Sequence, residues 1–177
     1  MSRLFLLGDF RFFPDNACMK PTLKKKVRAS ISGYCKQAVG NEPRIHYAQT
    51  RPFPLVDTIG VGWHTLDCSG FVVNCFWNAS HDLKVYVADP SGMKFSGYGN
   101  TWTMETWLRK NGKKVTEANG YLVGDIVMYD GHTAICSKAG TAGTSEWTSH
   151  GSEGGPRVVK LGYRDDIQGV WRHPAFL

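Results

Sequence analysis

The most informative segment of the sequence is Asp67-Cys68-Ser69-Gly70-Phe71-Val72. Aspartate is a preferred N-cap residue, so this segment predicts a helix that begins near residue 67. Apolar residues then recur at helical spacing and form one stripe: Phe71, Val72, Cys75, Phe76 and Ala79. Cys68 therefore falls in the first turn, where a helix N-terminus favours a thiolate. A buried core cysteine is the alternative interpretation, and it suits Cys75 better because Cys75 lies on the apolar stripe.

A second segment, Tyr129-Asp130-Gly131-His132-Thr133, predicts a β-hairpin. Asp-Gly between two apolar runs is a strong signal for a two-residue turn, with strands over 126–129 and 132–136. His132 opens the second strand, which can hold an imidazole rigidly enough to act as a base toward a thiol. A structural role is the alternative for a lone histidine on a strand. Cys68 and His132 are the pair that a cysteine hydrolase needs, and we expect them to meet in an open groove.

A third group should orient the His132 ring, because the tautomer of an imidazole depends on what its other nitrogen binds. We assign this role to His150, at the end of a strand predicted over 147–150. Glu146 and Glu153 are alternatives, and a surface-loop position is a further interpretation of His150. Three other histidines are expected to be exposed to solvent: His64, His81 and His173. No two histidines have i, i+4 spacing with a helical glutamate, so we expect no metal site and no cofactor.

The remaining pattern predicts two more helices. Residues 22–39 have an apolar face at helical spacing, with Thr22 as the cap. Residues 104–110 form a shorter candidate, capped by Thr103. Residues 80–103 are rich in Gly, Ser and Asp, and we expect a long surface insertion there.

The order of the elements predicts the α+β class. Residues 44–54 are expected to be extended, and 157–163 to form a further strand after the hairpin. Helices thus precede a run of antiparallel strands. The length of 177 residues predicts one domain over 1–177, opened by an irregular segment over 1–21.

Charge and cysteine content narrow the function classes. The net charge of +6 lies in the N-terminal third: residues 1–60 carry ten Lys/Arg and four Asp/Glu, whereas 61–177 carry eleven of each. Such a surface can hold an anionic partner or be a solvated helix face. No nucleic-acid-binding motif is present, so we expect no nucleic-acid partner.

Five cysteines without a Cys-x-x-Cys pair indicate free thiols. No apolar run is long enough for a membrane helix or a signal peptide, and we expect no membrane insertion.

The two motifs, in this order, resemble those of the NlpC/P60 cysteine peptidases, which are papain-like cell-wall hydrolases. The resemblance is carried by residues 67–72 and by Gly124-Asp125-Ile126-Val127 leading into Gly131-His132-Thr133-Ala134-Ile135. It covers about residues 43–165 and implies N-terminal helices packed on a C-terminal antiparallel sheet. The segments 45–52 and 149–156 look more particularly like endolysins of phages that infect actinobacteria.

The resemblance also implies roles for single residues. It makes Cys68 the nucleophile, His132 the base and His150 the third polar residue. Three further residues match positions on the substrate side of the cleft: Tyr47, Asp67 and Ser69. The hydroxyl of Tyr47 is expected near the oxyanion.

The implied activity is hydrolysis of peptidoglycan stem peptides through a thioester, with the γ-D-glutamyl–diaminopimelate bond as the expected bond. One alternative is a CHAP-type N-acetylmuramoyl-L-alanine amidase, which uses a similar Cys/His pair. Another is a wall-binding or phage structural module without activity. An envelope-associated acyltransferase would need a lipid-facing apolar segment, which we do not find. We expect a monomer that binds bacterial peptidoglycan and, lacking a signal peptide, waits in the host cytoplasm before release.

Overall fold

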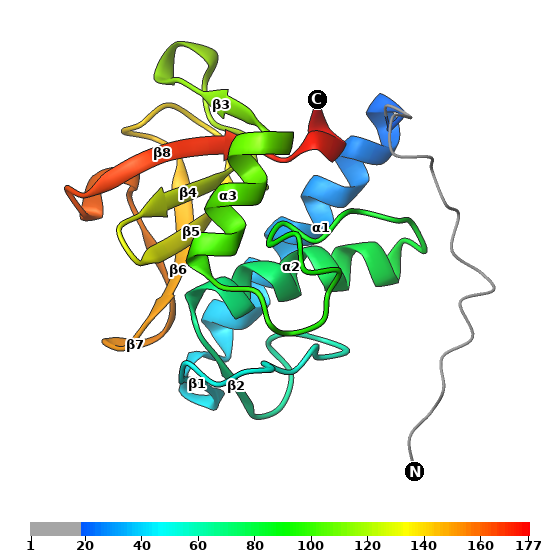
Figure 1. Ribbon diagram of the computed structural model, residues 1–177, viewed down its shortest axis with the longest axis vertical. Coiled ribbons are helices and arrows are strands. Elements are labelled where there is room, and N and C mark those ends of the chain that lie inside the picture. The colour runs from blue at the N-terminus through cyan, green and yellow to red at the C-terminus, as the bar shows by residue number, and fades with distance from the viewer. Residues whose placement is uncertain (1–18) are drawn as a thin grey trace.

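The computed structural model describes residues 19–177, which contain three α-helices and two β-sheets (Figure 1). The helices are α1 (Pro21–Gly40), α2 (Cys68–Asp82) and α3 (Thr101–Asn111). A small parallel sheet pairs β1 (Ile45–Tyr47) with β2 (His64–Leu66). The main sheet is antiparallel, and its strands in spatial order are β3 (Lys113–Val115), β8 (Ile167–Arg172), β4 (Ile126–Tyr129), β5 (His132–Lys138), β6 (Glu146–Gly151) and β7 (Gly154–Val159). The predicted α+β class is confirmed.

The two faces of the main sheet are buried in different ways. The helices cover one face, where residues such as Ile126, Met128 and Ile135 join the apolar stripe of α2 (Figure 1). The opposite face carries a second cluster around Trp147, which includes Tyr129 and Ala134. Because side chains alternate along a strand, β4 and β5 contribute to both cores and are buried almost throughout.

The predicted hairpin is confirmed. Tyr129 pairs with His132 across the turn, and Gly131 has a positive φ of 63°, which glycine adopts without strain. The Asp67 cap is confirmed as well, since its carboxylate accepts a hydrogen bond from the Gly70 backbone N–H. The local signals around residues 67 and 131 were therefore sufficient to place both motifs.

Two predicted caps were wrong. Helix α1 begins at Pro21 after Lys20, without a side-chain cap, because proline at the first position has no N–H to satisfy. Helix α3 is capped by Asn100 in a capping box, in which Thr103 is the third helical residue rather than the cap.

Other predictions need correction in the loops and at the C-terminus. Most of the segment 1–21 lies outside the described residues. The segment 80–103 is not a simple surface insertion, because Val85, Val87 and Asp89 are buried in it. The strand expected over 157–163 is instead β7, which ends at Val159, and β8 follows later in the chain. His173 is fully buried against the rings of Phe76, Trp107 and Phe176.

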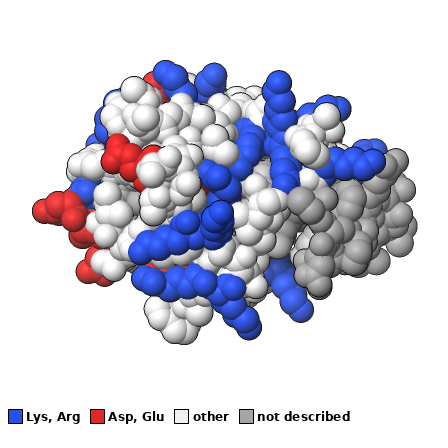
Figure 2. All heavy atoms as spheres, turned by 90° about the horizontal axis from the view of Figure 1, so that it is seen from above, with Lys and Arg blue, Asp and Glu red and all other residues white. Residues whose placement is uncertain are grey.

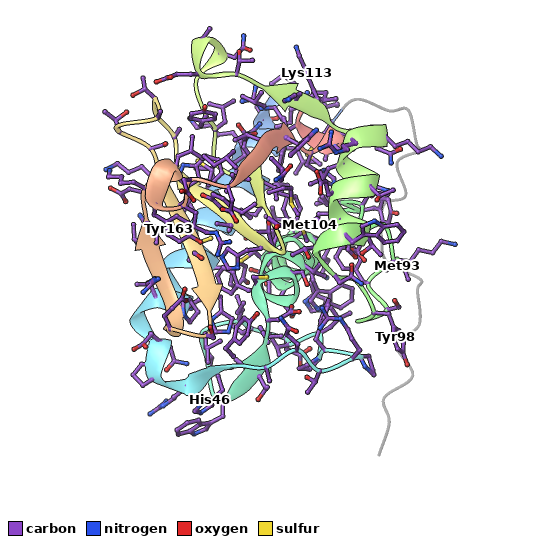
Figure 3. The ribbon with its side chains drawn as sticks, turned by 60° about the vertical axis from the view of Figure 1, so that its left-hand side comes forward. His46, Met93, Tyr98, Met104, Lys113 and Tyr163 are labelled. Carbon is purple, nitrogen blue, oxygen red and sulfur yellow. The ribbon has the colours of Figure 1, made fainter. Side chains whose placement is uncertain are left out.

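Charge is unevenly distributed over the surface. Figure 2 shows Lys and Arg side chains gathered on the face that carries β3 and the start of α1, with Asp and Glu mostly at one side. We call this the basic face. The exposed lysines of β3 and of the start of α1 are Lys25, Lys26, Lys113 and Lys114. Lys113 and His46 lie at opposite ends of the molecule (Figure 3). Within residues 19–177, none of the helices combines the length and the apolar character that a membrane crossing requires.

Two buried asparagines of α2 hold the irregular segment that precedes it. Asn74 accepts from the Val56 N–H at 2.9 Å and donates to the Pro54 carbonyl at 3.1 Å. One turn later, Asn78 accepts from the Ile59 N–H at 2.7 Å and donates to the Val56 carbonyl at 2.8 Å. Buried backbone groups need partners, so these amides fix a loop that has no regular ladder of its own.

We predict that Asn78→Ala destabilises the fold by about 2–4 kcal/mol, because it leaves the Ile59 N–H and the Val56 carbonyl buried without their partner. The measurement is the free energy of unfolding in denaturant. Asn111→Ala is the matched control, since Asn111 is exposed and bonds only the Trp107 carbonyl of its own helix; a change within about 0.5 kcal/mol is expected there. Equal effects of the two variants would contradict the role of Asn78.

Candidate active site

Cys68 is the first residue of α2, and the sequence places it there through Asp67. The Asp67 Oδ1 atom accepts from the Gly70 N–H at 2.7 Å and from the Ser69 hydroxyl at 2.9 Å. Its Oδ2 atom accepts from Arg51 at 2.5 Å. The Asp67 carboxylate thus ties the first turn of α2 to the loop between β1 and β2.

The sulfur of Cys68 lies against the start of β5. The backbone N–H groups of Thr133, Ser69 and Cys68 itself lie near enough to lower its pKa. Thr133 directly follows His132, so two parts of the chain that are distant in sequence meet where the predicted base begins its strand. Three backbone donors around one sulfur are suited to stabilising negative charge there.

Burial opposes that charge. Cys68 is only 3% exposed, so its side chain is buried rather than open to solvent. Desolvation, followed by the nearby Asp67 carboxylate, raises the Cys68 pKa to about 11. The thiol is therefore protonated at neutral pH in the free protein.

His132 is also buried, with 9% of its surface exposed. Burial, then the charge of Arg164, lowers the pKa of its imidazole to about 4. The ring is thus neutral at neutral pH, which is the state a general base requires.

The group that contacts the His132 ring is Ser149. The His132 Nε2 atom lies 2.8 Å from the Ser149 hydroxyl oxygen, which in turn lies 2.9 Å from the Tyr163 hydroxyl. Nδ1 is therefore the ring nitrogen left for a proton-transfer partner. Tyr163 also contacts the His132 ring edge-on, with centroids 6.4 Å apart. A His–Ser–Tyr chain can fix the orientation and tautomer of the base.

His150, the residue assigned as the third polar group, makes its contacts with the small sheet. Its Nε2 atom bonds the Leu66 carbonyl oxygen at 3.0 Å, and its ring packs edge-on against Tyr47 at 5.5 Å between centroids. It therefore joins β6 to the small sheet that leads into α2. A catalytic role for His150 stays a prediction, and the same holds for Cys68 and His132.

The register of β6 explains why Ser149, and not its neighbour, contacts His132. Ala134 pairs with Ser149, so Ser149 shares a face with Ala134 and with His132 two residues earlier. A bulge between Cys136 and Lys138 shifts the pairing by one residue, so that Lys138 lies opposite Glu146. If the register of the Lys138–Glu146 pair held along the whole of β5, Ala134 would pair with His150 instead of Ser149. His150 would then share a face with His132.

The three residues expected on the substrate side surround the start of α2. Tyr47 pairs with Leu66 across the small sheet, and burial raises the pKa of its phenol, with the charges of Cys68 and Asp67 adding to the effect. The Tyr47 hydroxyl is thus neutral and close to the thiol. Ser69 and Asp67 are both buried and bonded to each other.

A pocket of about 340 Å³ opens beside Tyr47. It lies between β1 and the turn from β6 to β7, and its lining residues include Glu42, His46 and Ser152. His46 stacks on the exposed ring of Trp63, with centroids 5.3 Å apart.

Glu146, one of the alternatives for the third residue, instead pairs with Lys138 on the surface. Glu153 lies near enough for its charge to raise the His132 pKa.

Among residues 19–177, no group of three or more His, Cys, Asp or Glu side chains could hold a metal ion. Sequence reasoning missed three residues at the site, among them Tyr163, which ends the hydrogen-bonded chain from His132. Arg51 lies in a loop with no periodic pattern, and Ser149 depends on the bulge. An Arg-Pro dipeptide before an apolar run carries no signal for an ion pair.

Comparison with solved structures supports this architecture. The peptidoglycan hydrolase RipB from Mycobacterium tuberculosis aligns with a TM-score of 0.54 at 13% identity, over 88% of this chain and 68% of that protein. The P60 domain of antigen MAP1204 from M. avium subspecies paratuberculosis aligns with a TM-score of 0.51 at 12% identity, over 86% of this chain and 97% of the domain. The predicted NlpC/P60-like α+β architecture is thereby confirmed. No family model matches the sequence, and no curated protein matches it either.

We predict that alkylation of Cys68 by iodoacetamide rises about tenfold per pH unit between pH 7 and 10. The reason is that the thiolate fraction grows tenfold per unit below a pKa of about 11. The measurement is the labelling rate of the Cys68 peptide by mass spectrometry. His132→Ala is the comparison variant and should leave the slope unchanged. A plateau that begins below pH 7 in the wild type and vanishes in His132→Ala would instead reveal a resting thiolate–imidazolium pair.

Proposed function

We propose that this protein is a peptidoglycan hydrolase of the NlpC/P60 type, a cysteine endopeptidase that cleaves stem peptides. The observation that carries the proposal is the sulfur of Cys68, which lies at the start of a helix and against the backbone that follows His132. The fold shared with RipB, a peptidoglycan hydrolase, supports the substrate class. The γ-D-glutamyl–diaminopimelate bond is the bond we propose.

The reaction is acyl transfer in two steps. As the Cys68 sulfur attacks the amide carbonyl carbon, its proton passes to His132, which then protonates the leaving amine as the C–N bond breaks. Water attacks the resulting thioester, with His132 taking a proton from the water and the Cys68 thiol restored as the acid is released. A neutral thiol and a neutral imidazole suit this sequence of steps, because the proton then moves only when the carbonyl is present.

The oxyanion of each tetrahedral intermediate needs donors. Backbone N–H groups of the first turn of α2 are the nearest candidates, and the neutral Tyr47 hydroxyl is a further one. Because Cys68 is 3% exposed, the substrate must displace part of what covers the first turn of α2, and the pocket beside Tyr47 is where we place its approach.

The setting we propose is a phage endolysin that acts on the bacterial wall after release from the host cytoplasm. The basic face would attract an anionic wall. It lies at the opposite end of the molecule from His46 beside the pocket (Figure 3), so it would hold the protein on the wall rather than guide a substrate into the site.

We predict that wild-type protein digests purified peptidoglycan and leaves new amino termini on diaminopimelate, whereas Cys68→Ala releases no fragments. The alanine should cost little stability, because it removes one sulfur from an otherwise intact helix start. Mass spectrometry of the soluble fragments is the measurement, with a thermal unfolding curve as the folding control. Free lactyl groups on the glycan would favour the amidase alternative. Absence of turnover by a folded wild type would favour the non-catalytic module.

We also predict that Ser149→Ala lowers kcat about tenfold with little change in KM, because it removes the group that orients the His132 ring. Thr148→Val is the matched control: Thr148 is the neighbouring buried residue, and its hydroxyl has no hydrogen-bond partner among the described residues. The measurement is steady-state cleavage of a stem peptide by both variants. Equal losses in the two, or none in Ser149→Ala, would mean that Ser149 does not position the base.

A further inference from the structure

Arg51 lies in the loop between β1 and β2. Its Nη2 atom donates to Asp67 Oδ2 at 2.5 Å and to the Ser69 hydroxyl at 3.2 Å, and its Nη1 atom donates to the Thr50 carbonyl oxygen at 2.8 Å. The guanidinium also lies over the ring of Phe53, 5.2 Å from its centroid. These contacts hold a cation directly beside the residues that flank Cys68.

The two members of this ion pair are unequally accessible. The Asp67 side chain is 5% exposed, whereas that of Arg51 is 24% exposed. A group that approaches the start of α2 therefore meets the cation and not the carboxylate. The charge presented to a substrate on this side of Cys68 is positive.

Arg51 also retains hydrogen-bonding capacity. A guanidinium has five N–H groups, and three of them are used in the contacts with Asp67, Ser69 and Thr50. Two remain without a partner among residues 19–177. The planar guanidinium is well matched to a carboxylate, and charge-assisted hydrogen bonds of this kind are stronger than neutral ones.

We propose that Arg51 determines specificity by binding a free carboxylate of the substrate next to the scissile bond, so that a stem peptide with that carboxylate is preferred over its carboxamide form. This proposal rests on the proposed function and names the substrate class more narrowly. The bond to Asp67 positions Arg51, and one of its two remaining N–H groups, on Nε or Nη1, contacts the substrate carboxylate. Asp67 and Ser69 then act through Arg51, as positioning residues.

The test compares two synthetic stem peptides of identical sequence, one with a carboxylate and one with a carboxamide beside the scissile bond. The quantity is the ratio of their kcat/KM values in each protein. Wild type should prefer the carboxylate by about tenfold to hundredfold, as expected for a charge-assisted hydrogen bond. Arg51→Gln should bring the ratio near one, and Arg51→Lys should retain part of it because the charge remains.

Arg44→Gln is the matched control. Arg44 is an exposed arginine a few residues earlier in the chain, in the short 3-10 turn before β1, and it should keep the wild-type ratio. A ratio within one protein is insensitive to a general loss of activity, which a purely structural role of Arg51 would produce. If Arg51→Gln has no measurable turnover, the same ratio is taken from dissociation constants of both peptides, by calorimetry, on Cys68→Ala with and without Arg51→Gln.

The outcomes separate the two proposals. If wild type cleaves both peptides at equal rates, or Arg51→Gln keeps the wild-type ratio, the role of Arg51 is overturned and the hydrolase proposal stands. If folded wild type cleaves neither peptide nor peptidoglycan, the proposed function fails and the specificity proposal fails with it. A preference for the carboxylate that disappears only in Arg51→Gln supports both.

Discussion

The site depends on one buried carboxylate. Asp67 is 4% exposed, and a buried charge is tolerated only with partners. One of its oxygens caps α2 through the Gly70 N–H, and the other holds Arg51. Helix start, nucleophile candidate and the neighbouring cation are thus fixed by a single side chain. Removing it would leave a helix N-terminus without its cap and a cation without its counter-charge.

Helix α2 organises the irregular part of the chain in the same manner. Along its length, buried polar side chains bind backbone groups of the segments that pass over it. Asn74 and Asn78 hold the loop over 54–59, and Ser80 bonds the backbone at Val85 and Val87. Segments without regular structure therefore have fixed positions against α2, although their sequence shows no periodic pattern.

What the sequence could predict was local. The Asp67 cap, the Asp-Gly turn and the apolar stripe each involve neighbours within a few residues, and all three were found. The missed features depend on distant pairing. The bulge after Cys136 decides whether Ser149 or His150 joins the face of His132, and no local signal marks it. His173 is buried because α2, α3 and the C-terminal turn bring three rings around it. The sequence around this histidine does not predict those contacts. Arg51 likewise bonds Asp67 and Ser69 only when α2 packs beneath the loop that carries Arg51.

The protonation states of Cys68 and His132 in the free protein depend on the sizes of opposing effects on their pKa values. The sequence motif alone does not determine them. A helix N-terminus stabilises an anion by about 0.3–1 kcal/mol, which is less than one pKa unit. Full burial can move a pKa by several units in the opposite direction. At Cys68 the second effect is larger, with the Asp67 charge added to it, so the thiol keeps its proton despite three backbone donors. Burial likewise keeps His132 neutral at neutral pH. In the proposed reaction, charge separation is therefore a step of its own, and the backbone N–H groups of Thr133, Ser69 and Cys68 lower its cost.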